Sequence, residues 1–193
     1  LSLSLSLSLS LSLFLSLFAL STNNTTSSYR YGNDPRYYYH RALAYYEQRQ
    51  YNNSIMDLRD SLKLAPESDF ADKALYCMGL AFSNMGDYAH AAPCFSRAYG
   101  IRKKCIHYCH ERAKAYQMIG RVTEAVEDFN SVIRRQPNNA NAFFRRGFAH
   151  KSLGMFSEAA EDFEKAKKLD PNNAKLIVNY KKIYNTECIV LCK

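Results

Sequence analysis

The sequence predicts an all-α solenoid of helix-turn-helix repeats, and three observations support this prediction. First, landmark residues return at a fixed period: Gly154, Ala159 and Phe163 have the same residue types about 34 positions earlier. Second, Gly86, Gly120 and Gly154 each separate two apolar-periodic segments, as expected where a helix ends in a left-handed conformation. Third, Pro follows the second segment in three of the four copies, and Pro cannot continue a helix.

Each copy is expected to contain two closely packed helices. A small residue recurs in the second helix, where the two helices must approach each other, and an aromatic residue follows four positions later on the same face. These positions hold Ala91 and Phe95 in the second copy, whereas the first copy has Ser54 and Leu58. The predicted helices lie near 36–48, 51–64, 70–85, 88–101, 105–119, 122–135, 140–153 and 156–169.

Two prolines inside this pattern carry separate expectations. Asp34 and Pro35 are expected to begin the first helix, as the N-cap and the first helical residue. Pro93 is the sixth residue of its predicted helix. A proline there is expected either to kink the helix or to move its start further along the chain.

The repeats resemble the tetratricopeptide repeat (TPR), whose pattern is W-x2-L-G-x2-Y, then A-x3-F, then P, over 34 residues. The fourth copy matches with Phe143, Arg146, Gly147, His150, Ala159, Phe163 and Pro171, and no copy has the Trp. The resemblance covers residues 35 to 173. It implies a right-handed α-solenoid with a TPR domain at 35–185, made of repeats at about 35–68, 72–105, 106–139 and 140–173. An amphipathic helix at 174–185 is expected to cap the last open face.

The two ends of the chain do not follow the repeat pattern. Residues 1–34 are a low-complexity Leu/Ser segment and a polar linker, predicted to be disordered or artefactual. Three interpretations of the Leu/Ser segment compete: a signal peptide, a transmembrane helix and a translated CT dinucleotide repeat. The third is favoured, because a signal peptide would need an initiating Met and a basic n-region, and about half of the positions are too polar for a membrane span. Residues 186–193 are an apolar tail, interpreted as a truncated end.

Charge and cysteine content indicate the compartment and the kind of partner. The chain has 26 Lys and Arg against 18 Asp and Glu, and its net charge is +8. Because the basic residues are scattered, they are interpreted mainly as solvated helix faces, with an acidic partner as the sharper alternative. Its six Cys show no framework spacing, so a reducing, cytoplasmic location without a membrane is expected.

No catalytic or metal-binding motif is apparent in the sequence. Cys105, His107, Cys109 and His110 form the one cluster of soft ligands, but it lies at a predicted helix start and Cys109 should be buried. Asp128 and Asp162 recur at the repeat spacing, as do Glu124 and Glu158, and recurrence favours helix-surface structure over a catalytic pair. The chain is therefore predicted to be no enzyme, with no catalytic residue, metal, cofactor or small-molecule substrate.

The resemblance to TPR proteins also implies a binding face, because the first helix of each repeat lines an inner groove in that family. The groove slots of this chain are rich in aromatic residues and mildly basic, which suits an extended or helical peptide with apolar anchors and acidic character. The predicted partner-binding residues are Tyr39, His40, Leu43, Tyr76, Leu80, His110, Lys114, Phe144, Arg145, Phe148 and Lys151.

The first functional hypothesis is a protein-interaction scaffold that binds a peptide in this groove. Some TPR proteins hold chaperone tails through a carboxylate clamp, formed by Lys, Asn and Arg at fixed positions of three successive repeats. Whether these positions are counted from the first or from the second repeat of this chain, only Arg145 matches, so that role is not expected. A targeting or regulatory module of a larger, catalytic protein is the alternative. A basic nucleic-acid-binding solenoid is less favoured, because its aromatic and basic residues follow no RNA-repeat code.

Overall fold

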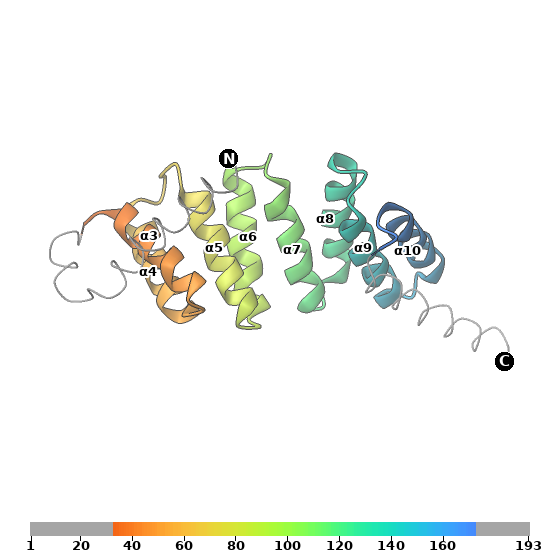
Figure 1. The fold of residues 1–193 in the computed structure, drawn as a ribbon, viewed down its shortest axis with the longest axis horizontal. Coiled ribbons are helices and arrows are strands. Elements are labelled where there is room, and N and C mark those ends of the chain that lie inside the picture. The colour runs from red at the N-terminus through yellow and green to blue at the C-terminus, as the bar shows by residue number, and fades with distance from the viewer. Residues whose placement is uncertain (1–32, 173–193) are drawn as a thin grey trace. The chain divides into compact units, whose positions relative to one another are not determined.

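Residues 33–172 are described by the structure, a computed structural model, and they form eight α-helices without a strand. They fall into two compact units, unit 1 (residues 33–102) and unit 2 (residues 103–172). Unit 1 contains α3 (Pro35–Glu47), α4 (Tyr51–Leu64), α5 (Ala71–Asn84) and α6 (Tyr88–Ile101) (Figure 1). Unit 2 contains α7 (Ile106–Met118), α8 (Val122–Arg135), α9 (Ala140–Ser152) and α10 (Phe156–Leu169). The predicted all-α fold is confirmed, with each helix end within one residue of its predicted position.

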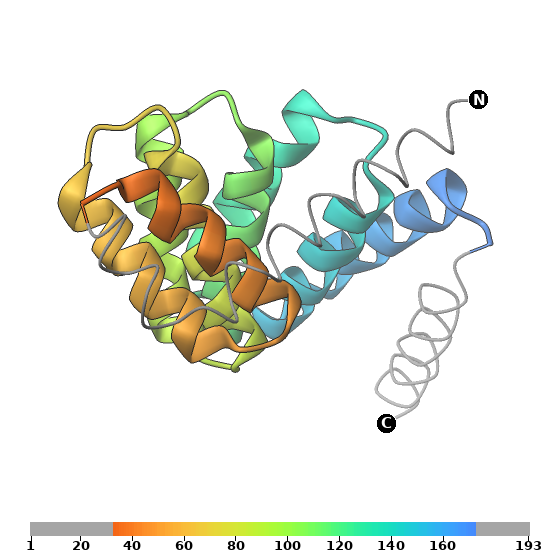
Figure 2. The ribbon, with the colours of Figure 1, turned by 60° about the vertical axis from the view of Figure 1, so that its left-hand side comes forward.

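Within each unit, consecutive helices pack side by side. The helices α3 and α4 form one pair and α5 and α6 the next, with α4 packed against α5 (Figure 2). In unit 2, α7 pairs with α8 and α9 with α10, and α8 packs against α9. Each unit is therefore two stacked helix-turn-helix repeats of a helical solenoid. The predicted capping helix at 174–185 and the segments 1–32 and 186–193 lie outside the described residues.

The turns between paired helices depend on one residue with positive φ. Gly86, Gly120 and Gly154 have φ of 81°, 81° and 76°, as predicted. In the first repeat Arg49 takes this place with φ of 60°, although the left-handed conformation costs a non-Gly residue about 1–2 kcal/mol. The amide of the next residue, Gln50, still donates to the carbonyl of Tyr45 at 2.8 Å, so the turn keeps its closing hydrogen bond.

The core of each repeat forms where the predicted small and aromatic residues meet. Ala91, Ala125 and Ala159 are fully buried, as is Ser54 at the same position of the first repeat. A Cβ added to Gly79 would lie only 2.6 Å from the Phe95 ring, so this glycine permits the close approach of α5 and α6. Asp34 caps α3 by accepting a hydrogen bond from the amide of Arg36, as expected. The helix α6 begins at Tyr88, so Pro93 lies inside it and does not delay its start.

A buried ion pair recurs in three repeats, always between residues sixteen positions apart. In each case an Arg from the first helix donates two hydrogen bonds of 2.5–2.9 Å to an Asp of the second helix. The pairs are Arg41 with Asp57, Arg112 with Asp128, and Arg146 with Asp162.

These pairs correct the expectation that Asp128 and Asp162 belong to a helix surface, because both are buried. An unpaired buried carboxylate would be costly, and the bidentate guanidinium removes that cost. Glu124 and Glu158, which share their periodicity, are half-buried and exposed respectively. Periodicity alone did not distinguish the two kinds of acidic residue.

Candidate functional site

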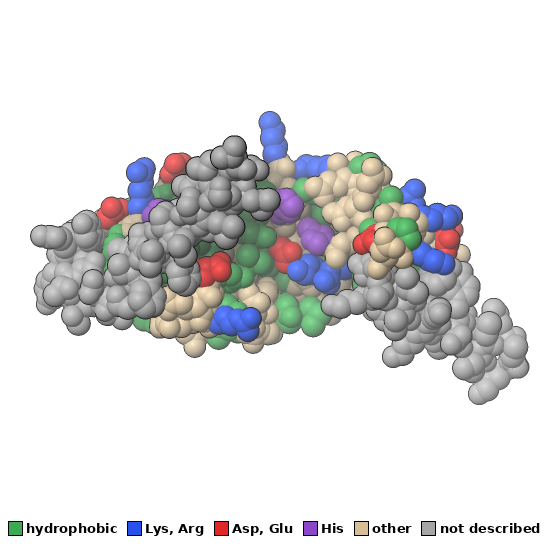
Figure 3. All heavy atoms as spheres, in the orientation of Figure 1, with side chains coloured by type: hydrophobic (Ala, Val, Ile, Leu, Met, Phe, Trp, Pro, Cys, Tyr) green, Lys and Arg blue, Asp and Glu red, His purple; other side chains and the backbone are tan. Residues whose placement is uncertain are grey.

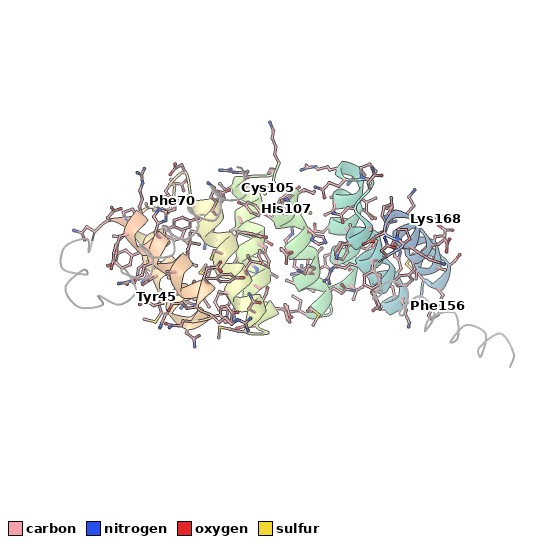
Figure 4. The ribbon with its side chains drawn as sticks, in the orientation of Figure 1. Tyr45, Phe70, Cys105, His107, Phe156 and Lys168 are labelled. Atoms are coloured by element: carbon pink, nitrogen blue, oxygen red, sulfur yellow. The ribbon has the colours of Figure 1, made fainter. Side chains whose placement is uncertain are left out.

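In unit 1, the predicted inner-face residues lie on α3 and α5, the first helices of the two repeats. Tyr39, Leu43, Tyr76 and Leu80 are half-buried, and His40 is exposed. The centroid of the Tyr39 ring lies 5.0 Å from that of Phe70, the residue before α5. Figure 4 labels Phe70. Burial raises the pKa of the Tyr39 hydroxyl, and the negative charge of nearby Asp72 raises it further, so this tyrosine stays neutral.

A hydrogen bond directly joins these two helices. Asn84 at the end of α5 donates from its side-chain amide to the Tyr46 hydroxyl at 2.8 Å. Both residues occupy groove slots of the TPR pattern, although neither was among the predicted binding residues. The bond links the ends of α3 and α5 on the inner face of unit 1. In the sequence, it could have been found only by comparing inner-face positions of successive repeats.

In unit 2, the aromatic part of the predicted site is a cluster of three phenylalanines. The rings of Phe144 and Phe148 on α9 are 4.9 Å apart and meet edge to face. Each also contacts the ring of Phe163 on α10, at 5.8 and 5.2 Å. Phe163 is 2% exposed, whereas Phe144 and Phe148 are half-buried. The two α9 rings therefore belong partly to the core and partly to the surface.

Several charged residues of the unit 2 inner face already have partners within the chain. Lys114 lies 2.6 Å from the Glu111 carboxylate, and His110 lies 3.7 Å from the same carboxylate. Burial opposes ionisation of Glu111, but hydrogen bonds and charge from His110 and Lys114 outweigh it and lower its pKa to about 2. Arg145 donates to the side chain of Asn141 at 3.0 Å. Lys151 is half-buried and forms no ion pair with another described residue.

The cysteine cluster at the start of α7 is divided by burial. Figure 4 labels Cys105 and His107 at the beginning of this helix. Cys109 is 1% exposed, as predicted, and burial raises the pKa of its thiol to about 12. Burial also raises the pKa of the Cys77 thiol to about 12, so both sulfurs stay protonated and poorly nucleophilic. Between residues 33 and 172, no three His, Cys, Asp or Glu residues form a group that could hold a metal ion.

The chain belongs to the tetratricopeptide repeat family. Family models described as tetratricopeptide repeat match residues 35–68, 72–105, 111–139 and 140–173. These matches confirm the resemblance that the landmark residues indicated. A comparison with curated proteins finds no match to this chain.

Solved structures with the same fold include several TPR proteins. YrrB, described as a TPR protein with an unusual peptide-binding site, is 20% identical, with a TM-score of 0.72 over 78% of this chain and 76% of that chain. MamA (41-end) from Desulfovibrio magneticus RS-1 is 19% identical, with a TM-score of 0.73 over 79% of this chain and 85% of that chain. The first TPR of Spaghetti (RPAP3), bound to the HSP90 peptide SRMEEVD, is 25% identical, with a TM-score of 0.57 over 61% and 93% of the two chains.

The described helices also bear on membrane insertion. None of α3 to α10 combines the length and the apolar character that a membrane-spanning helix needs.

Proposed function

We propose that this chain is a protein-interaction scaffold that binds a peptide segment of a partner along the first helices of its repeats. The observation that carries the proposal is the incomplete burial of apolar side chains on these helices. Tyr39, Leu43, Tyr76 and Leu80 in unit 1 stay half-buried, as do Phe144 and Phe148 in unit 2. Half-buried rings on a rigid helix offer apolar area at little entropic cost, which is the character of interface hot spots.

The chemistry around these rings favours a peptide with an apolar anchor next to an acidic residue. Phe144 and Phe148 would contact the anchor, because both rings are half-buried and each is held in place by an edge-to-face contact with Phe163. Lys151 and Arg145 stand on the same helix and would attract a carboxylate. Glu111 neutralises Lys114, so the attraction is centred on α9 rather than α7.

The side chains in the clamp slots argue against a chaperone-tail carboxylate clamp. The clamp requires Asn, Lys or Arg at its positions. Counted from the first repeat, two of these positions hold Cys77 and Glu111, and counted from the second repeat, one of them holds Glu111. Cys77 is buried, and Glu111 remains negatively charged at neutral pH, so it would repel a peptide carboxylate. The RPAP3 structure holds the peptide SRMEEVD, and we expect this chain not to bind that peptide.

The proposal is tested by selecting peptides from a random display library on the intact chain and measuring their affinity by fluorescence anisotropy. Phe148→Ala and Arg145→Ala should each weaken the selected peptide by about tenfold or more, since truncated aromatic and Arg hot spots typically cost about 2 kcal/mol. Lys165→Glu, an exposed position on α10, is the matched control and should leave the affinity within about twofold. Helix content by circular dichroism should be unchanged in all three variants.

The reverse result would contradict the proposal. If Lys165→Glu abolished binding while Phe148→Ala and Arg145→Ala bound normally, the partner would use the second helices. Tight binding of SRMEEVD by the wild-type chain would overturn the exclusion of the clamp.

A further inference from the structure

Four basic residues of unit 2 meet at the edge where α7 begins and α8 ends. Lys103 and Lys104 lie in the loop before α7, and Arg134 and Arg135 are the last two residues of α8. All four are exposed. None forms an ion pair with another residue of the range 33–172. We call this group the basic edge.

A hydrogen bond holds the basic edge together. The guanidinium of Arg135 donates from Nη1 to the backbone carbonyl of Lys103 at 2.8 Å. Arg134 donates from Nη2 to the Ser131 hydroxyl at 3.2 Å. The loop is therefore tied to the end of α8 at Lys103, and Lys104 and Arg134 are next in sequence to the two residues of this contact. Figure 3 shows a basic side chain standing clear of the surface above the loop that leads into α7.

The other repeat of unit 2 shows that the fold does not need this cluster. Where the loop has Lys103 and Lys104, the next two loops have Pro137 with Asn138, and Pro171 with Asn172. The helix α6 ends at Ile101, and Lys103 stands where the next two repeats have this proline.

The ends of α8 and α10 differ in the same way. One repeat after Arg134 and Arg135, the chain has Lys168 and Leu169, and Lys168 is paired with Glu164 at 3.7 Å. At the basic edge, four like charges are gathered without a carboxylate, which is electrostatically unfavourable in the free protein. An anionic partner would remove this repulsion.

We propose that the basic edge is a second interaction surface, which binds an acidic, carboxylate-rich stretch of a protein partner. Two features favour a peptide over a nucleic acid. Residues 102–107 and 134–139 contain no Phe, Tyr or Trp on which bases could stack. Arg102, the basic residue next to the edge in the chain, is already paired with Asp72 at 2.8 Å, so it adds little to a track for a phosphate backbone. The surface thus suits a short acidic stretch.

This surface is distinct from the inner-face site of the proposed function. It uses loop and helix-end cations without an aromatic anchor, whereas the inner face depends on Phe144 and Phe148. A probe without apolar side chains therefore separates the two sites. A fluorescent peptide of about eight glutamates is such a probe, and the corresponding glutamine peptide is its neutral control.

The test measures binding of the glutamate peptide to the intact chain by fluorescence anisotropy at low ionic strength. The triple variant Lys103→Glu, Lys104→Glu, Arg134→Glu should lower the affinity by about tenfold or more, and added salt should weaken wild-type binding steeply. Arg135 is left in place because it holds the loop. The triple variant Lys165→Glu, Lys167→Glu, Lys168→Glu makes the same change in net charge on α10 and should lower the affinity less than about threefold.

Several outcomes would overturn the inference. Equal losses in the two triple variants, or equal binding of the glutamine peptide, would show that the edge has no specific role. No measurable binding by the wild-type chain would do the same. Single-stranded RNA that binds more tightly than the glutamate peptide, and is lost with the first triple variant, would assign the edge to nucleic acid. Phe148→Ala should leave glutamate-peptide binding unchanged. The inference about the basic edge and the proposed function of the inner face are thus tested independently.

Discussion

Replacing Asp128 with Cys alone is expected to lower the free energy of unfolding by about 3 kcal/mol. Arg112 would then keep its charge while only 19% of its side chain is exposed, and its two hydrogen bonds of 2.7 and 2.6 Å would be lost. The second repeat shows how the cost can be avoided. At the positions equivalent to Arg112 and Asp128 it has Met78 and Cys94, and both are buried.

The double variant Arg112→Met, Asp128→Cys copies this solution into the third repeat. It should unfold within about 1 kcal/mol of the wild-type chain or be more stable, because a buried ion pair can often be replaced by well-packed apolar residues without loss. Urea unfolding followed by circular dichroism measures both variants. If the double variant were as unstable as the single one, the pair would contribute through its own attraction and not through neutralisation of a buried charge.

Replacing Ala159 with Asp is expected to unfold the fourth repeat. Ala159 is fully buried and packs with Phe163, Phe144 and Phe148 between α9 and α10. Extra volume in such a contact costs about 1–3 kcal/mol, and an unpaired buried carboxylate adds several kcal/mol. Loss of helix signal and a lower urea midpoint would report the effect.

Ser157→Asp is the matched control, since it introduces the same side chain at an exposed position in the first turn of α10. The helix dipole favours an acidic residue there, so this variant should unfold at or slightly above the wild-type midpoint. A stable Ala159→Asp chain would mean that the two helices do not meet closely at residue 159.

The helices could be predicted from the sequence because their ends are set by local chemistry. Gly86, Gly120 and Gly154 close the turns through a positive φ, and prolines such as Pro137 stop the second helices. The turn at Arg49 could not be assigned in this way, because nothing in an Arg residue indicates a left-handed conformation. Repeat alignment is the signal that would have found it, since Arg49 occupies the position of Gly86.

The buried ion pairs could not be predicted from either partner alone. Arg41, Arg112 and Arg146 occupy the position that holds Leu in the TPR pattern, and the recurrence of the acidic partners by itself favours a helix surface. The sequence does contain one sign that the two positions are in contact. In the second repeat, both partners are replaced together, by Met78 and Cys94. For the inner face, the sequence indicates which residues lie on the first helices but not how deeply each side chain is buried. It therefore did not show that Phe144 and Phe148 both contact Phe163.

Site-specific photo-crosslinking tests the central claim most directly, namely that the first helices of the repeats bind the partner. A benzophenone amino acid placed at Tyr76 in α5 or at Phe144 in α9 should crosslink to the selected peptide. The same group at Arg97 in α6 or Lys165 in α10, both exposed, should not. Crosslinks from residues 97 and 165 with none from 76 and 144 would contradict the claim and place the partner on the second helices.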